Sequence, residues 1–119
     1  MKIIHSFVRA VAMSAEAMKW WNRIKFGQVL NMNSNDYRVM DVLAYQHHMN
    51  DESKMVFTKS DLARFCNMGR RSLTRSVKNL ERHGWIELDK KRPGYAKYYS
   101  IPRFEAWLRR EEGLTETPF

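Results

Sequence analysis

The sequence predicts a mainly α-helical domain with a small antiparallel β-hairpin towards its C-terminal end. Apolar residues recur at helical spacing over most of the first 82 residues, whereas residues 85–101 alternate as a half-buried pair of strands does. A length of 119 residues fits one domain. With 44% hydrophobic residues, five glycines and three prolines, the composition is that of a globular chain and argues against a disordered one.

Positive charge is concentrated in the second half of the chain. The sequence has 21 Lys and Arg residues against 13 Asp and Glu residues, a net charge of +8. Residues 58–110 hold fourteen of these bases and five of the acids, whereas residues 111–119 hold three acids and no base. A small protein with this excess is attracted to polyanions, and the charge alone fits nucleic acid or an acidic membrane surface.

The first predicted helix covers residues 7–25. Its apolar stripe consists of Phe7, Val11, Met18 and Trp21. The stripe fits a helix packed on the domain or against a second copy of the chain. Because Trp20 and Trp21 stand beside basic residues, it also fits a helix lying in a membrane surface. We expect residues 1–32 to form an N-terminal extension that joins two copies into a homodimer.

Two more helices are predicted over residues 34–48 and from Thr58 to about Cys66. Asn33 or Ser34 can cap the first of them, and Asp36, which we expect to be a surface acid, suits its positive end. Thr58 and Asp61 have the spacing of a capping box. The buried residues expected in the second helix are Leu62, Ala63 and Phe65, and Asn67 is expected to adopt the left-handed conformation that ends it.

The helix from Gly69 to about Arg82 is the most informative segment. At 100° per residue, Leu73, Val77 and Leu80 share one face. The opposite face carries Arg71, Arg75, Lys78 and Arg82. A solvated helix usually mixes acids among such bases, but here the only acid, Glu81, lies nearer the apolar side. This asymmetry indicates a surface that meets a polyanion.

A basic hairpin and a short helix complete the predicted domain. Residues 85–89 and 95–101 read as strands, joined by the turn Lys90-Lys91-Arg92-Pro93-Gly94. Phe104, Trp107 and Leu108 then recur at helical spacing, which predicts a short C-terminal helix. The predicted domain spans residues 33–112, followed by a flexible tail at 113–119.

The order of these elements resembles a winged helix-turn-helix over roughly residues 33–102. The resemblance is carried by residues 57–63, by the turn Asn67-Met68-Gly69 and by residues 73–86. It is similar both to small bacterial transcription regulators and to plasmid replication proteins of the RepL type. Those families usually have Gly where Asn67 stands and Ser or Thr where Gly69 stands. The resemblance implies a winged helix-turn-helix with an extra N-terminal helix, which binds DNA.

The residue types themselves also point to double-stranded DNA. A major groove accepts one α-helix, and Arg can bond a guanine through two donors. The first amides of the helix after Thr58 can hold a phosphate, and a basic hairpin can reach the backbone or the minor groove. The expected DNA-binding residues are Thr58, Lys59, Arg70, Arg71, Ser72, Thr74, Arg75, Lys78, Lys90, Lys91, Arg92 and Lys97.

Other kinds of site have little support in the sequence. The adjacent His47 and His48 point about 100° apart on a helix, so they chelate a metal poorly, and no Cys-rich zinc motif accompanies Cys66. No catalytic motif is present. We therefore expect no enzyme activity, metal, cofactor or small-molecule ligand. Without a run of about 18 apolar residues or a clear signal peptide, we expect no membrane span and a cytoplasmic protein.

The biological role remains open between three hypotheses. The first is a transcription regulator, in particular a repressor, that binds as a dimer to two half-sites one helical turn apart. The second is a replication or segregation protein of a plasmid or phage that binds repeated DNA sites. The third is a winged-helix protein-interaction module, which would have no affinity for duplex DNA.

Overall fold

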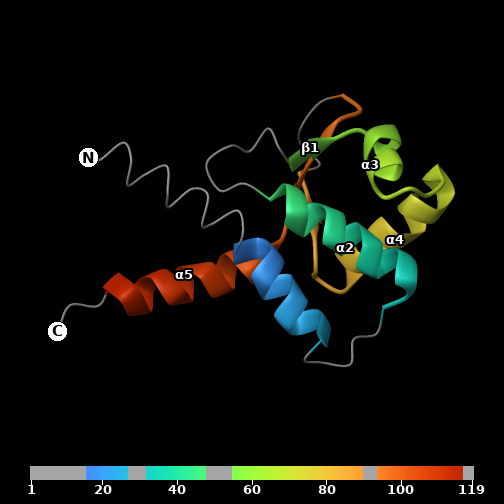
Figure 1. Ribbon diagram of the computed structural model, residues 1–119. Coiled ribbons are helices and arrows are strands. Elements are labelled where there is room, and N and C mark those ends of the chain that lie inside the picture. Colours follow the sequence, from blue (N-terminus) through green and yellow to red (C-terminus); the bar gives the residue numbers. More distant parts are fainter. Residues whose placement is uncertain (1–15, 27–31, 48–54, 90–93, 117–119) are drawn as a thin grey trace.

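The computed structural model describes residues 16–26, 32–47, 55–89 and 94–116, which form helices around a small three-stranded sheet (Figure 1). Residues 16–26 are helical. They are followed by α2 (Ser34–Gln46), β1 (Val56–Phe57), α3 (Lys59–Phe65), α4 (Arg70–Arg82), β2 (Glu87–Leu88), β3 (Lys97–Ser100) and α5 (Pro102–Glu116). This order confirms the predicted winged helix-turn-helix architecture.

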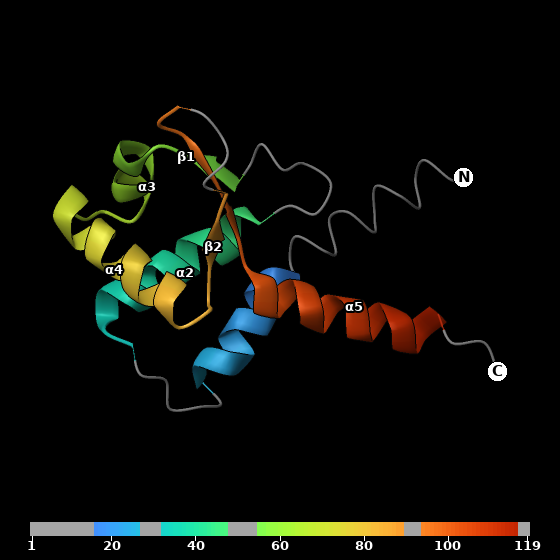
Figure 2. The ribbon, with the colours of Figure 1, turned by 180° about the vertical axis from the view of Figure 1, so that it is seen from behind.

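The sheet has the strand order β1-β3-β2, and both pairings are antiparallel. We call the hairpin of β2 and β3 the wing. In it, Leu88 of β2 pairs with Tyr99 of β3, whereas Phe57 of β1 pairs with Lys97 on the other edge of β3. β1, which directly precedes α3, is thus hydrogen-bonded to β3 of the wing. The first turn of α3 therefore lies close to the wing. Figure 2 shows β2 below β1 in the same small sheet. The predicted basic turn at residues 90–93 lies outside the described residues.

Side-chain caps begin α2 and α3 as the sequence predicts. Asn33 Oδ1 accepts from the Asp36 amide at 2.8 Å, and Asp36 Oδ2 accepts from the Asn33 amide at 3.3 Å, which completes a capping box. Thr58 Oγ1 accepts from the Asp61 amide at 3.1 Å. Gly69 precedes α4 and offers no side-chain cap.

In the turn between α3 and α4, Asn67 adopts the left-handed conformation that the sequence predicts. Its φ of 53° is left-handed, and two backbone bonds surround it: Met68 N to Ala63 O and Asn67 N to Arg64 O, both 3.0 Å. This pair of bonds is a Schellman motif, which satisfies carbonyls that the end of a helix leaves without partners. A second such motif ends α4 at Gly84, whose φ is 76°.

The helix at residues 16–26 packs into the domain's own core. Trp20 and Trp21 are at most 4% exposed. The ring of Trp20 lies 5.6 Å from that of Phe104 on α5, and Trp21 meets Trp85 edge-on at 6.1 Å. Both indoles therefore contact this chain, as expected for a helix packed on the domain. Residues 7–15 of the predicted helix lie outside the described residues.

Three expectations were wrong. Asp36 is wholly buried rather than a surface acid, because it points towards α4. Phe65 is 58% exposed, because Leu62, Ala63 and Cys66 form the buried face of α3 and Phe65 lies about 100° from its middle. The C-terminal helix is not short: α5 has 15 residues and continues past Gly113 to Glu116.

Candidate nucleic-acid interface

α4 presents two chemically opposite faces. Leu73, Val77 and Leu80 are buried, and Ser76 is buried beside them. Arg71, Arg75, Lys78 and Arg82 are all exposed, and we call these four residues the basic face of α4. Glu81, the only acid of the helix, is half-buried and lies close enough to Tyr99 to affect its ionisation. The basic face is therefore a continuous row of hydrogen-bond donors turned to solvent.

Two other residues predicted to contact DNA lie at the sides of this face. Ser72 and Thr74 are half-buried, about 90° and 70° from its middle. The Thr74 hydroxyl donates to the Arg70 carbonyl oxygen at 2.8 Å. Its proton is thus engaged within the helix, and the oxygen can act towards a ligand only as an acceptor.

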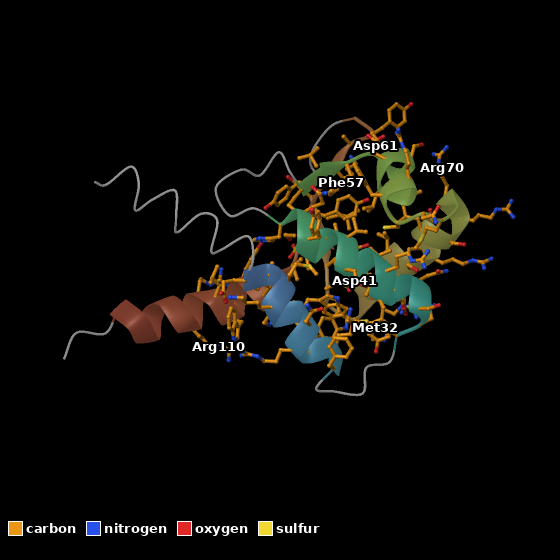
Figure 3. All side chains as sticks on the ribbon, in the orientation of Figure 1. Met32, Asp41, Phe57, Asp61, Arg70 and Arg110 are labelled. Carbon is orange, nitrogen blue, oxygen red and sulfur yellow. The ribbon has the colours of Figure 1, made fainter. Side chains whose placement is uncertain are left out.

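A hollow of about 560 Å³ lies between the start of α3, the start of α4 and the wing. We call it the wing hollow. Its lining consists of Thr58, Lys59, Ser60, Arg70, Leu88, Gly94, Tyr95, Lys97 and Tyr99. Four of these residues were predicted from sequence to contact DNA, and the structure brings them together. Arg70 projects from the start of α4 at the end of the molecule far from α5 (Figure 3).

The wing hollow is suited to an anion. Three of its lining residues, Lys59, Arg70 and Lys97, are cationic, several others carry hydroxyl groups, and none is acidic. Such a set of donors can surround the oxygens of one or more phosphates. Lys90, Lys91 and Arg92, which were predicted to extend this surface, lie outside the described residues.

Sequence reasoning missed three lining residues with polar groups, Ser60, Tyr95 and Tyr99. Tyr95 is 93% exposed beside Gly94, although aromatic rings of this size are usually sheltered. The signal was present, because Tyr95 follows the basic turn directly in the sequence. The sequence predicts Tyr95 in a returning strand, but β3 begins only at Lys97.

Side chains from α2 and α5 hold both ends of α4. Arg38 Nη1 donates to the Cys66 carbonyl oxygen at 3.4 Å, in the turn before α4. Asn79 Nδ2 donates to Asp36 Oδ2 at 2.8 Å, and Arg103 Nη2 donates to the His83 carbonyl oxygen at 2.6 Å. These polar contacts fix α4 against the helices behind it and leave the basic face clear.

Burial shifts the pKa of two groups in the core, Cys66 and Tyr99. Burial raises the pKa of the Cys66 thiol to about 11, against the opposing effect of the Arg38 charge. Burial, aided by the nearby Glu81 and Cys66, also raises the pKa of the Tyr99 hydroxyl. Both groups are therefore protonated at neutral pH, and a protonated thiol is a poor nucleophile.

The described residues contain no group of three His, Cys, Asp or Glu side chains that could hold a metal ion. His47, one of the histidines considered from sequence, is buried and packs edge-on against Phe104 at 4.9 Å. No described helix is long and apolar enough to cross a bilayer.

Comparison with known families agrees with this geometry. The protein has the architecture of the winged helix-turn-helix class. The model of the Crp-like helix-turn-helix domain matches residues 37–97, just over half of the chain, from α2 into β3. The chain belongs to this family of DNA-binding domains. No curated protein and no solved structure matches it significantly, and the resemblance to RepL-type proteins is not confirmed.

Proposed function

We propose that the protein recognises a specific sequence of double-stranded DNA and regulates transcription, as a repressor. The observation that carries this proposal is the basic face of α4, which is exposed along the whole helix and contains no acid. α4 enters the major groove, where Arg71, Arg75 and Lys78 reach base edges. Repression then needs only that the bound domain covers a promoter.

The wing hollow supplies the second half of the contact. Lys59, Arg70 and Lys97 bind phosphates of the strand that borders the groove, and this fixes the height and angle at which α4 enters. The exposed Tyr95 ring lies at the rim of this contact and packs against the sugar-phosphate backbone. DNA recognition thus combines base contacts from the basic face of α4 with backbone contacts from α3, from the wing and from the first residue of α4.

We propose further that two copies bind one DNA site. The support is a second hollow, of about 460 Å³, lined by Met18, Lys25, Asp41, Val42, Tyr45, Gln46 and Phe65. Its two charged residues pair with each other at 2.9 Å, and Tyr45 and Phe65 are exposed. Two strongly basic chains can meet at such a neutral, partly apolar surface without bringing like charges together.

Selection from a pool of random duplex DNA at near-physiological salt tests the proposal. We expect enrichment of an inverted repeat whose half-sites are about one helical turn apart, because a two-fold dimer repeats its contacts at that distance. Genomic copies of the site should overlap promoters. A matched selection with Arg71, Arg75 and Lys78 all changed to Ala controls for binding by charge elsewhere on the chain.

Each result of the selection separates the hypotheses. Copies repeated at a replication origin would replace the transcriptional role by replication or segregation. A single half-site would remove the dimer and keep the DNA-binding function. No enrichment, with no duplex affinity even at low salt, would overturn the proposal and favour a protein-interaction module.

A further inference from the structure

A hydrogen bond between two helices joins α4 to the interior of the domain. Asn79 Nδ2 on α4 donates to Asp36 Oδ2 on α2 at 2.8 Å, across 43 positions of sequence. α2 and α4 lie side by side in both ribbon views (Figures 1 and 2). Asp36 is wholly buried, and Asn79 is half-buried at the edge of the basic face.

Capping alone does not explain why Asp36 is buried. A capping box needs only an acceptor near the first turn, and an exposed carboxylate provides one at no cost in desolvation. The capping contact of Asp36, to the Asn33 amide, is the longer of its two bonds at 3.3 Å. Its other oxygen, Oδ1, is buried and has no hydrogen-bond partner among the described residues. Since burying a carboxylate is costly, stability is a poor reason for this arrangement.

The position of Asn79 on α4 suggests a different reason. Asn79 lies one turn after Arg75 and about 40° from it around the helix, between the basic face and the buried face. Leu73, Val77 and Leu80 hold α4 by apolar packing, which is not directional and tolerates small rotations. A hydrogen bond weakens steeply as its angle departs from linear, so it fixes rotation and register together.

We propose that Asp36 and Asn79 are positioning residues for DNA recognition. Their bond sets the rotation of α4 at which Arg75 and its neighbours meet base edges, although neither residue needs to touch DNA. The inference rests on the proposed function, because it concerns how well a specific sequence is distinguished from other DNA. Loss of the bond should reduce this discrimination more than it reduces affinity for random duplex.

A donor–acceptor swap tests the bond at the net charge and side-chain sizes of the wild type. Asn79→Asp removes the amide donor and adds a charge, whereas in the double variant Asp36→Asn/Asn79→Asp the amide and the carboxylate exchange places. The measured quantity is the ratio of dissociation constants for random and selected duplexes at one salt concentration. We expect Asn79→Asp to lower this ratio about tenfold and the swap to restore most of it, as for contacting residues whose effects are not additive.

The control separates positioning from general destabilisation. Ile101→Ala removes a fully buried side chain from the segment between β3 and α5, so it lowers the melting temperature and leaves both Asp36 and Asn79 in place. It should leave the ratio unchanged when measured well below the melting transition. An unchanged ratio in Asn79→Asp, or no recovery in the swap, would overturn the inference alone. If the wild-type protein binds selected and random duplexes equally well, both the inference and the proposed function are rejected.

Discussion

Arg103 and His83 join the first turn of α5 to the residue that caps the C-terminal end of α4. Arg103 Nη2 donates to the carbonyl oxygen of His83 at 2.6 Å, and its guanidinium lies 3.9 Å from the centre of the Trp85 ring. The carbonyl is one that the end of a helix leaves without a partner, and a cation is favourable at that negative end. The Arg103 side chain thus caps the C-terminal end of α4 and covers the indole of Trp85.

Replacing Arg103 by Ala should therefore lower the free energy of unfolding by about 1–2 kcal/mol, the sum of a charged hydrogen bond and a cation–π contact at a partly exposed site. Urea denaturation at neutral pH measures this difference. Arg109→Ala is the matched control, because Arg109 is also exposed on α5. The two variants would be equally stable if the contacts of Arg103 contributed nothing.

Arg75 occupies the middle of the basic face, so its guanidinium is expected to read a base. Arg75→Ala should weaken binding to the selected duplex by about 1–3 kcal/mol and relax the preference at one or two base pairs. Fluorescence anisotropy on the selected duplex and on single-base variants measures both effects. Arg109→Ala, which removes the same charge on α5, controls for net charge. If Arg75→Ala only lowers the salt dependence, Arg75 contacts a phosphate instead.

Lys59 lines the wing hollow, where we expect contacts to phosphates rather than bases. Lys59→Ala should weaken binding to selected and random duplexes by a similar factor and reduce the slope of log K against log salt by about 1. Titrations at three or more salt concentrations give the slope. A shift in base preference with an unchanged slope would place Lys59 at a base edge and contradict this assignment.

Local signals in the sequence predicted the element order and several of the helix ends. Thr58 and Asn33 cap their helices as expected, and Asn67 takes the left-handed conformation. The two faces of α4 also follow from the spacing of its residues alone. Each of these features depends on neighbours within about one or two turns, and this is the range over which sequence patterns are informative.

Features set by contacts between distant segments could not be predicted in this way. The pairing of β1 with β3 brings Thr58 near Lys97, and no spacing in the sequence indicates that register. Asp36 was expected at the surface because its position suits a helix start, but its bond to Asn79 depends on how α2 crosses α4. The wing hollow and the buried carboxylate are therefore findings of the structure.

Cys66 should make the domain sensitive to alkali. The thiol is 1% exposed just before the turn into α4, and burial raises its pKa from an ordinary 9.0 to about 11. Because the folded state retains the thiol proton to higher pH than the unfolded chain does, the stabilisation is fully present below pH 9. This stabilisation is lost as the pH rises through 11. The rise in the thiol pKa from 9.0 to about 11 corresponds to roughly 2–3 kcal/mol of the free energy of unfolding.

Urea denaturation between about pH 8 and pH 11 compares the wild type with Cys66→Ala, which has no thiol to ionise. The wild type should lose about 2–3 kcal/mol more than the variant over this range. Both proteins should also lose stability through Tyr99, whose pKa is raised mainly by burial and which titrates in the same direction. Parallel curves would show that the Cys66 thiol ionises as readily in the folded domain as in the unfolded chain.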